Sequence, residues 1–114
     1  MSKRNPDIYL HDILDSIQQI EEYLDGVSKN DFYNNLEKQD AVLRRLEIVG
    51  EADKHISDEI RTEYKNIPWR KIAGMRDVII HEYFGVTLSM IWIVAKRDLP
   101  ELKKKIQKVI SDRS

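Results

Sequence analysis

The sequence predicts an all-α protein, folded as an antiparallel bundle of four or five helices. Only 4 glycines and 3 prolines interrupt its 114 residues. Apolar residues recur at spacings of three and four along most of the chain, and no segment alternates with the period of two that a strand requires. Because the length is close to the commonest domain size, we expect one helical domain over residues 1–114.

The composition limits the class of protein and its partners. Hydrophobic residues make up 41% and charged residues 34% of the chain, which indicates a folded, water-facing protein. The 19 Lys and Arg nearly cancel the 20 Asp and Glu, so any contact with a nucleic acid must be local. The absence of cysteine, of an apolar leader and of a long apolar run predicts a cytoplasmic protein.

The first half of the chain predicts two long helices. One begins near Asp7, directly after Pro6, and ends before Gly26. The second is capped by Asn30 or Asp31 and runs to about residue 52 or 56. Gly50 interrupts this second helix, at some cost in helix propensity.

The second half predicts a short helix, a longer helix that carries the candidate site, and a basic tail. Ser57 opens a short capped helix over residues 57–64, and Pro68 precedes a helix over residues 69–83 that Gly85 ends. Thr87 caps the next helix, and Pro100 kinks or restarts it before the charged tail.

Arg76 is anomalous in the helix predicted over residues 69–83. At about 100° per residue, it falls inside the arc formed by the apolar residues of that helix. An unpaired guanidinium in apolar surroundings is costly, so Arg76 requires a carboxylate, a phosphate or a second subunit as its partner.

His81 and Asp77 form a second pair on the opposite, polar side of the same helix. They are four residues apart, so the carboxylate can orient the imidazole and favour its protonated form. Arg76 and His81 point about 140° apart on an ideal helix, so they reach one ligand only if two chains meet or the helix distorts locally. Tyr83, seven residues after Arg76, lies on nearly the same face as the arginine.

Each of these residues also has a purely structural interpretation. Arg76 is equally compatible with an ion pair to Glu47 or Glu51, and His81 with an exposed helix position. Arg44 and Arg45 are candidates for substrate binding, although such pairs usually lie on a solvated helix face. The three histidines lie in separate predicted helices and no cysteine is present, so we expect no bound metal.

The run over residues 69–86 resembles the signature of the HepT-like toxins, members of the HEPN (higher eukaryotes and prokaryotes nucleotide-binding) superfamily. The family pattern is an arginine, a polar residue, three or so further residues, a histidine, any residue and a tyrosine. Arg76, Asp77, His81 and Tyr83 fill it without a gap. Upstream, residues 44–52 are similar to the family's second characteristic stretch, so the resemblance covers essentially the whole chain.

The resemblance implies a helical homodimer with a shared cleft, and a metal-independent endoribonuclease that acts as the toxin of a toxin–antitoxin pair, without a cofactor. It also implies a nucleotidyltransferase antitoxin that silences the toxin by adding AMP to Tyr83. This addition would replace a neutral phenol by a bulky anion able to pair with Arg76.

A metal-independent mechanism would use the RNA's own 2′-hydroxyl as the nucleophile. His81 would act as general base or acid, Arg76 would stabilise the phosphorane, and Asp77 would orient His81. The alternative from another functional class is a non-catalytic nucleotide- or protein-binding subunit of a nucleotidyltransferase complex, with Arg76 holding a phosphate. A third is a purely structural bundle in which Arg76 is buried in an ion pair.

Overall fold

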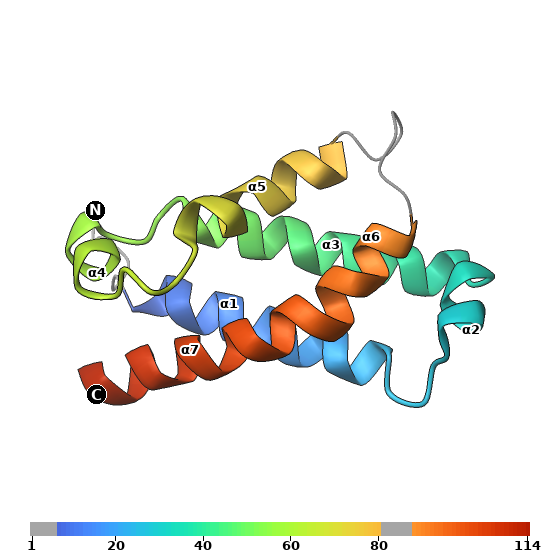
Figure 1. The fold of residues 1–114 in the computed structure, drawn as a ribbon, viewed down its shortest axis with the longest axis horizontal. Coiled ribbons are helices and arrows are strands. Elements are labelled where there is room, and N and C mark those ends of the chain that lie inside the picture. Colours follow the sequence, from blue (N-terminus) through green and yellow to red (C-terminus); the bar gives the residue numbers. More distant parts are fainter. Residues whose placement is uncertain (1–6, 81–87) are drawn as a thin grey trace.

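The structure, a computed structural model, describes residues 7–80 and 88–114, with side chains up to residue 76 and from residue 88 onward. Every element in these two ranges is helical, which confirms the predicted all-α class (Figure 1). The elements, in chain order, are α1 (Ile8–Tyr23), α2 (Lys29–Tyr33), α3 (Leu36–Asp53), α4 (Asp58–Glu63), α5 (Trp69–Ile80), α6 (Leu88–Ile93), a π-helical turn (Val94–Asp98) and α7 (Leu99–Arg113).

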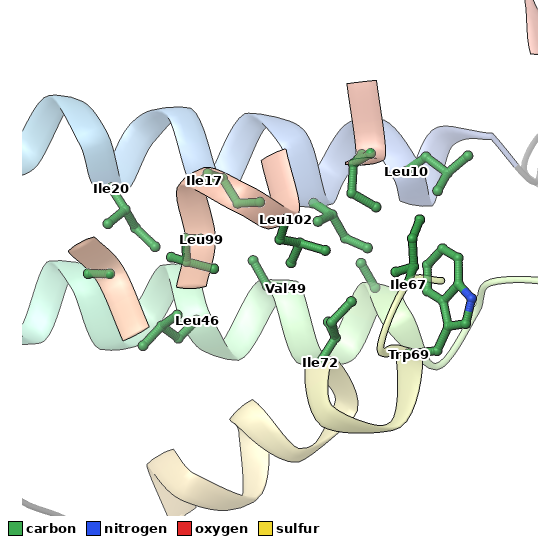
Figure 2. Packing of buried hydrophobic residues seen from close by; sticks show 14 of the residues in the cluster. Leu10, Ile17, Ile20, Leu46, Val49, Ile67, Trp69, Ile72, Leu99 and Leu102 are labelled. Carbon is green, nitrogen blue, oxygen red and sulfur yellow. The ribbon is translucent and has the colours of Figure 1, made fainter. Parts of the chain in front are cut away.

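The long helices pack around one apolar core. Helix α3 packs against α1 along one side and against α5 along the other, and α7 lies along α1 (Figure 1). Figure 2 shows side chains of α1, α3, α5 and α7 meeting between these helices. The apolar spacing of the first helix predicts a stripe through Ile8, Ile13 or Leu14, Ile17, Ile20 and Leu24. Of these, Ile13, Ile17, Ile20 and Leu24 are buried, whereas Ile8 is 37% exposed and Leu10 is buried at that end of the helix instead. Each buried residue of this size contributes about 1.5–3 kcal/mol of transfer free energy.

The single long second helix expected from the sequence is wrong, because the chain forms two helices there. Ser28, rather than Asn30 or Asp31, caps α2: its Oγ accepts from the Asp31 N–H at 3.0 Å while the Asp31 carboxylate accepts from the Ser28 N–H at 3.3 Å. Asn35 then leaves the helical conformation and its side chain accepts from the Lys38 N–H at 3.0 Å, which starts α3. A short polar side chain with a local backbone partner thus separates the two helices.

The expectations for α4 and the start of α5 are confirmed. Ser57 caps α4 by accepting from the Ile60 N–H at 3.3 Å, and α5 begins directly after Pro68. The buried Trp69 donates its indole N–H to the Tyr64 carbonyl oxygen at 3.1 Å, which fixes the entry to α5. The predicted end of this helix at Tyr83 and Gly85, and the predicted cap at Thr87, lie outside the described residues.

Pro100 restarts the last helix through a π-helical turn. The Leu99 N–H donates to the Val94 carbonyl oxygen, five residues earlier, and Pro100 follows within the first turn of α7. Proline has no N–H to donate and its ring crowds the preceding turn, so the wider turn accommodates it inside a continuous helical rod.

Asp53 and Arg61 join the end of α3 to α4 inside the protein. The Asp53 side chain is completely buried, and its Oδ2 lies 3.3 Å from the Arg61 Nη2. Arg61 also donates to the backbone carbonyl oxygens of Asp53 and Ile56. Burial raises the pKa of Asp53 above its usual value, against the opposing influence of the Arg61 charge and hydrogen bond.

None of the helices in the described ranges is both long and apolar enough to cross a lipid bilayer.

Candidate active site

Arg76 lies at the surface of the contact between α5 and α3, rather than in the apolar interior that the helical wheel suggested. Its side chain is 37% exposed, and its Nη1 lies 3.3 Å from Oε2 of Glu51 on α3. Glu51 is one of the two carboxylates that the sequence offered as a partner. Because 52% of the Glu51 side chain is exposed, this ion pair is open to water and does not seal the guanidinium in the core.

Gly50 explains how the Arg76 backbone comes so close to α3. It is buried in the last turn of α3, and a Cβ at this position would meet the Cβ and backbone nitrogen of Arg76 and, at 3.4 Å, the carbonyl oxygen of Ala73. The cost in helix propensity predicted for Gly50 therefore accompanies a close helix–helix approach that a larger residue would disturb.

Arg76 lines a surface cleft of about 400 Å³. We call it the α1–α3–α5 cleft, because α1, one face of α3 with the turn after it, and α5 supply its walls. It is lined by Tyr9, Asp12, Arg44, Glu47, Ile48, Glu51, Ala52, His55 and Arg76. The lining residues between 44 and 55 recur at spacings of three and four, as expected for one side of a helix and its continuation.

Carboxylates hold both arginines of the cleft. Arg44 Nη1 lies 3.3 Å from Oε1 of Glu47. Glu51 is shared, because its Oε2 meets Arg76 while its Oε1 lies 3.9 Å from Nε2 of His55. All of these side chains are at least one-third exposed, so the pairs contribute little to stability and can exchange with an incoming anion.

Tyr9 and His55 form a stacked aromatic pair in the same cleft. Their ring centroids are 4.7 Å apart, with an angle of 18° between the ring planes. The sequence gave no role to either residue, since the histidines were weighed only as metal ligands. The spacing of His55 from Glu51 and Arg44 on one helical face was the available signal.

The predicted site residues are only partly brought together within the described residues. Arg44 and Arg76 line the same cleft, whereas Arg45 is half-buried and is not part of its lining. Asp77 belongs to α5, but its side chain lies outside the described part of the structure, as do His81 and Tyr83 altogether. Their arrangement around Arg76 therefore stays a prediction.

Lysines of the basic tail lie near acidic side chains: Lys103 2.8 Å from Glu21, Lys105 3.9 Å from Glu101 and Lys108 3.6 Å from Asp112. Across residues 7–76 and 88–114, no three His, Asp or Glu side chains gather closely enough to hold a metal ion.

Comparison with known proteins gives a consistent result along the whole chain. Residues 13–109 match the model of the family described as "Ribonuclease HepT-like". A "Probable ribonuclease HepT" of Thermococcus cleftensis is 43% identical over 107 residues, which cover 94% of this chain and 97% of that protein. A "Putative RNase" of Methanocaldococcus jannaschii is 38% identical over 107 residues, covering 94% of this chain and 98% of that protein.

A longer relative also matches nearly the whole chain. A "Gamma-glutamylcyclotransferase and putative RNase" of Methanocaldococcus jannaschii is 46% identical over 110 residues, and the match covers 96% of this chain but spans half the length of that protein. No solved structure matched the chain. The family match and the identities, which extend over nearly the full sequence, show that the chain belongs to the HepT-like ribonuclease family.

Proposed function

We propose that this protein is a metal-independent endoribonuclease, the toxin of a toxin–antitoxin pair, which cleaves RNA with Arg76 and His81. The observation that carries the proposal is the placement of Arg76. Arg76 lines an open surface cleft, and its guanidinium is held by an exposed carboxylate, that of Glu51. The relatives whose names include ribonuclease support RNA as the substrate.

Arg76 is available to a substrate because its present partner is replaceable. An exposed ion pair contributes about 0–1 kcal/mol, since water screens both groups. A phosphate oxygen pair can accept two parallel hydrogen bonds from a guanidinium, which makes this contact stronger than a single bond to a carboxylate oxygen. A substrate phosphate would therefore displace Glu51 from Arg76.

The reaction would use the 2′-hydroxyl of the RNA. The 2′ oxygen attacks the adjacent phosphorus as the bond from phosphorus to the 5′ oxygen breaks, leaving a 2′,3′-cyclic phosphate and a free 5′-hydroxyl. His81 takes the proton of the 2′-hydroxyl or gives one to the departing 5′ oxygen, and Asp77 orients it. Arg76 stabilises the extra negative charge on the phosphorane.

A homodimer is part of the proposal, since Arg76 and His81 do not point the same way on an ideal helix. The surface most suited to a second copy is a mainly apolar groove of about 500 Å³ between α5 and α6. Two of its lining residues are exposed large hydrophobics, Met90 at 49% and Ile93 at 42%. The groove is lined in part by Gly74 and Met75 of α5, the helix that carries Arg76, so a second copy there would bring the α5 helices of the two subunits near each other.

Silencing by a nucleotidyltransferase antitoxin completes the proposal. Tyr83 follows Arg76 by seven residues, and AMP attached to its hydroxyl would carry a phosphodiester anion. That anion would compete with RNA for the Arg76 guanidinium. Intact mass measured after expression alone and with the antitoxin tests this step: AMP should be added to the wild type and not to Tyr83→Phe, and an unmodified wild type would contradict it.

The nuclease itself is tested with purified protein and a labelled RNA. Arg76→Ala and His81→Ala should each lower the cleavage rate by about a hundredfold or more, because each removes one of the two main catalytic contributions. Arg70→Ala is the matched control, since Arg70 is an exposed arginine of α5 outside the cleft. A chelator should have no effect, and a 2′-deoxy substitution at the cut position should block the reaction.

The outcome also separates the alternatives. Cleavage that survives both substitutions would contradict the assignment of Arg76 and His81. RNA that is bound but never cut, by a protein whose expression alone is harmless, would identify a binding subunit instead.

A further inference from the structure

We propose that the α1–α3–α5 cleft binds a nucleobase of single-stranded RNA, stacked on the ring of His55. The identification of the ligand as RNA rests on the proposed ribonuclease function. The location rests on the structure, which puts a stacked aromatic pair and the Arg76 guanidinium in one cleft.

His55 still offers surface for stacking after its contact with Tyr9. Tyr9 covers one face of the imidazole at a centroid distance of 4.7 Å, yet 51% of the His55 side chain remains exposed. Unpaired RNA bases commonly stack on aromatic side chains, histidine included. A base on the open side of His55 would extend the existing stack by one ring.

The pair is held firmly enough to act as a platform. Tyr9 lies in the first turn of α1, is half-buried and packs against the apolar core. His55 follows the end of α3, where its backbone N–H donates to the Ala52 carbonyl oxygen at 3.0 Å. Oε1 of Glu51 lies 3.9 Å from Nε2 of the imidazole. Little conformational freedom therefore remains to be lost when a base stacks there.

The charges of the cleft favour a base over a run of phosphates. Two arginines face three carboxylates, those of Asp12, Glu47 and Glu51, so the lining carries no positive excess. Such a lining does not attract an extended phosphate backbone but tolerates an uncharged, hydrogen-bonding base. Arg76 is then the contact for the one phosphate next to that base.

The size of the cleft points to one nucleotide. Its volume of about 400 Å³ lies within the range of pockets that hold small ligands, about 300–1,000 Å³. A double helix cannot present a base to such a cleft, because its bases are paired and stacked on one another. The substrate at this position is therefore an unpaired nucleotide of a loop, a bulge or a strand end.

The first test is a binding experiment that needs no cleavage. The proton resonances of the imidazoles are followed by NMR while AMP, or ribose 5-phosphate as the ligand without a base, is added to the wild-type protein. A stacked adenine should shift the His55 ring protons upfield by its ring current, whereas ribose 5-phosphate should not. His11, which is exposed on α1 outside the cleft lining, is the internal reference. Equal shifts with both ligands, or none at His55, would overturn the proposal.

The second test uses the cleavage reaction. His55→Leu should raise KM for a single-stranded RNA by about fivefold or more, the lower end of what stacking of one base on an aromatic side chain contributes. His55→Phe, which keeps an aromatic ring without a titrating group, should retain the wild-type KM, and His11→Leu is the matched control. An unchanged KM in His55→Leu would exclude the base platform and leave the nuclease assignment intact. A wild type that cuts no RNA would refute the nuclease assignment, while the NMR titration still decides the base site.

Discussion

A Cβ atom at position 50 would lie 2.9 Å from the Cβ of Arg76 and 3.0 Å from the Arg76 backbone nitrogen. Both neighbours are fixed parts of α5, so neither can swing aside as the end of a flexible side chain would. Gly50→Ala gains up to about 1 kcal/mol of helix propensity, but overpacking of a tight contact costs about 1–3 kcal/mol. We expect lower stability in urea denaturation, and slower RNA cleavage because Arg76 is displaced.

Gly74 is the matched control for this prediction. It lies inside α5, yet a Cβ added there would meet none of the described atoms within 4 Å. Gly74→Ala should therefore raise stability by about 0.5–1 kcal/mol, the gain of alanine over glycine in a helix. If both alanine variants were stabilised alike, the close approach at Gly50 would have no energetic importance.

Glu51 should position Arg76 at the expense of substrate affinity. In Glu51→Gln, Arg76 loses its charged partner at 3.3 Å. The guanidinium is then free to bind phosphate, but no carboxylate fixes its direction. We expect kcat to fall by about tenfold, as small misplacements of reacting groups do, while KM also falls. Stability should change by less than about 1 kcal/mol, because the pair is exposed.

Steady-state kinetics and thermal unfolding check the Glu51 prediction. Glu101→Gln is the control, since Glu101 is 73% exposed on α7 and its removal changes the net charge equally. A Glu51→Gln enzyme with wild-type kcat and KM would show that the ion pair is incidental.

The buried Asp53 and its partner Arg61 should make the free energy of unfolding depend on pH. Burial raises the folded-state pKa of Asp53 above 3.8, so its protonated form is favoured by folding. This contribution to stability is fully present below the unfolded pKa and is lost as the pH rises through the folded pKa. At higher pH, where Asp53 is charged, Arg61 offsets the cost of burying that charge, because its Nη2 lies 3.3 Å from the carboxylate.

Arg61→Met should thus be more damaging at pH 8 than near pH 4. Removing one partner of a buried pair costs about 3 kcal/mol when the other stays charged, and less when the remaining carboxyl can take up a proton. Urea denaturation at the two pH values measures the difference. An equal loss at both would show that Asp53 is not held as a buried, raised-pKa acid.

Charge introduced into the apolar groove between α5 and α6 should separate the subunits of the proposed dimer. Ile93 is 42% exposed in this groove, and an aspartate there would be desolvated without a partner in a dimer contact. Light scattering after size-exclusion chromatography should show Ile93→Asp as a monomer of about 13.5 kDa. Leu36→Asp, at a 69% exposed position at the start of α3, should leave the assembly unchanged. An unaltered Ile93→Asp dimer would place the interface elsewhere.

The sequence predicted most helices because local signals and apolar spacing agreed. Ser57 before an acidic turn marked α4, and Pro68 marked the start of α5. The break between α2 and α3 was missed because the apolar stripe continues across it, while the deciding contact is a side-chain cap at Asn35. Periodicity reports which face is buried, but a two-residue interruption barely disturbs it.

The sequence identified residues of the candidate site only where one residue differed in character from its neighbours on the same helical face. Arg76 was found because a cation fell on an apolar arc, and Glu51 was named as a partner. The Tyr9–His55 stack depends on α1 and the end of α3 meeting in space, which helical periodicity alone does not supply. The distance between Gly50 and Arg76 likewise arises from two helices whose crossing point no local pattern specifies.

The π-helical turn before Pro100 holds one residue more than a regular α turn, while the helices on either side of it continue as one rod. Loss of one residue within Val94–Asp98 would leave a regular α turn and keep α6 and α7 in nearly the same relative orientation. Trp92 would then keep its place beside Phe32, from whose ring centroid its own lies 5.5 Å away. The cost of such a single-codon deletion would fall on Pro100, whose ring would crowd the tightened turn before it.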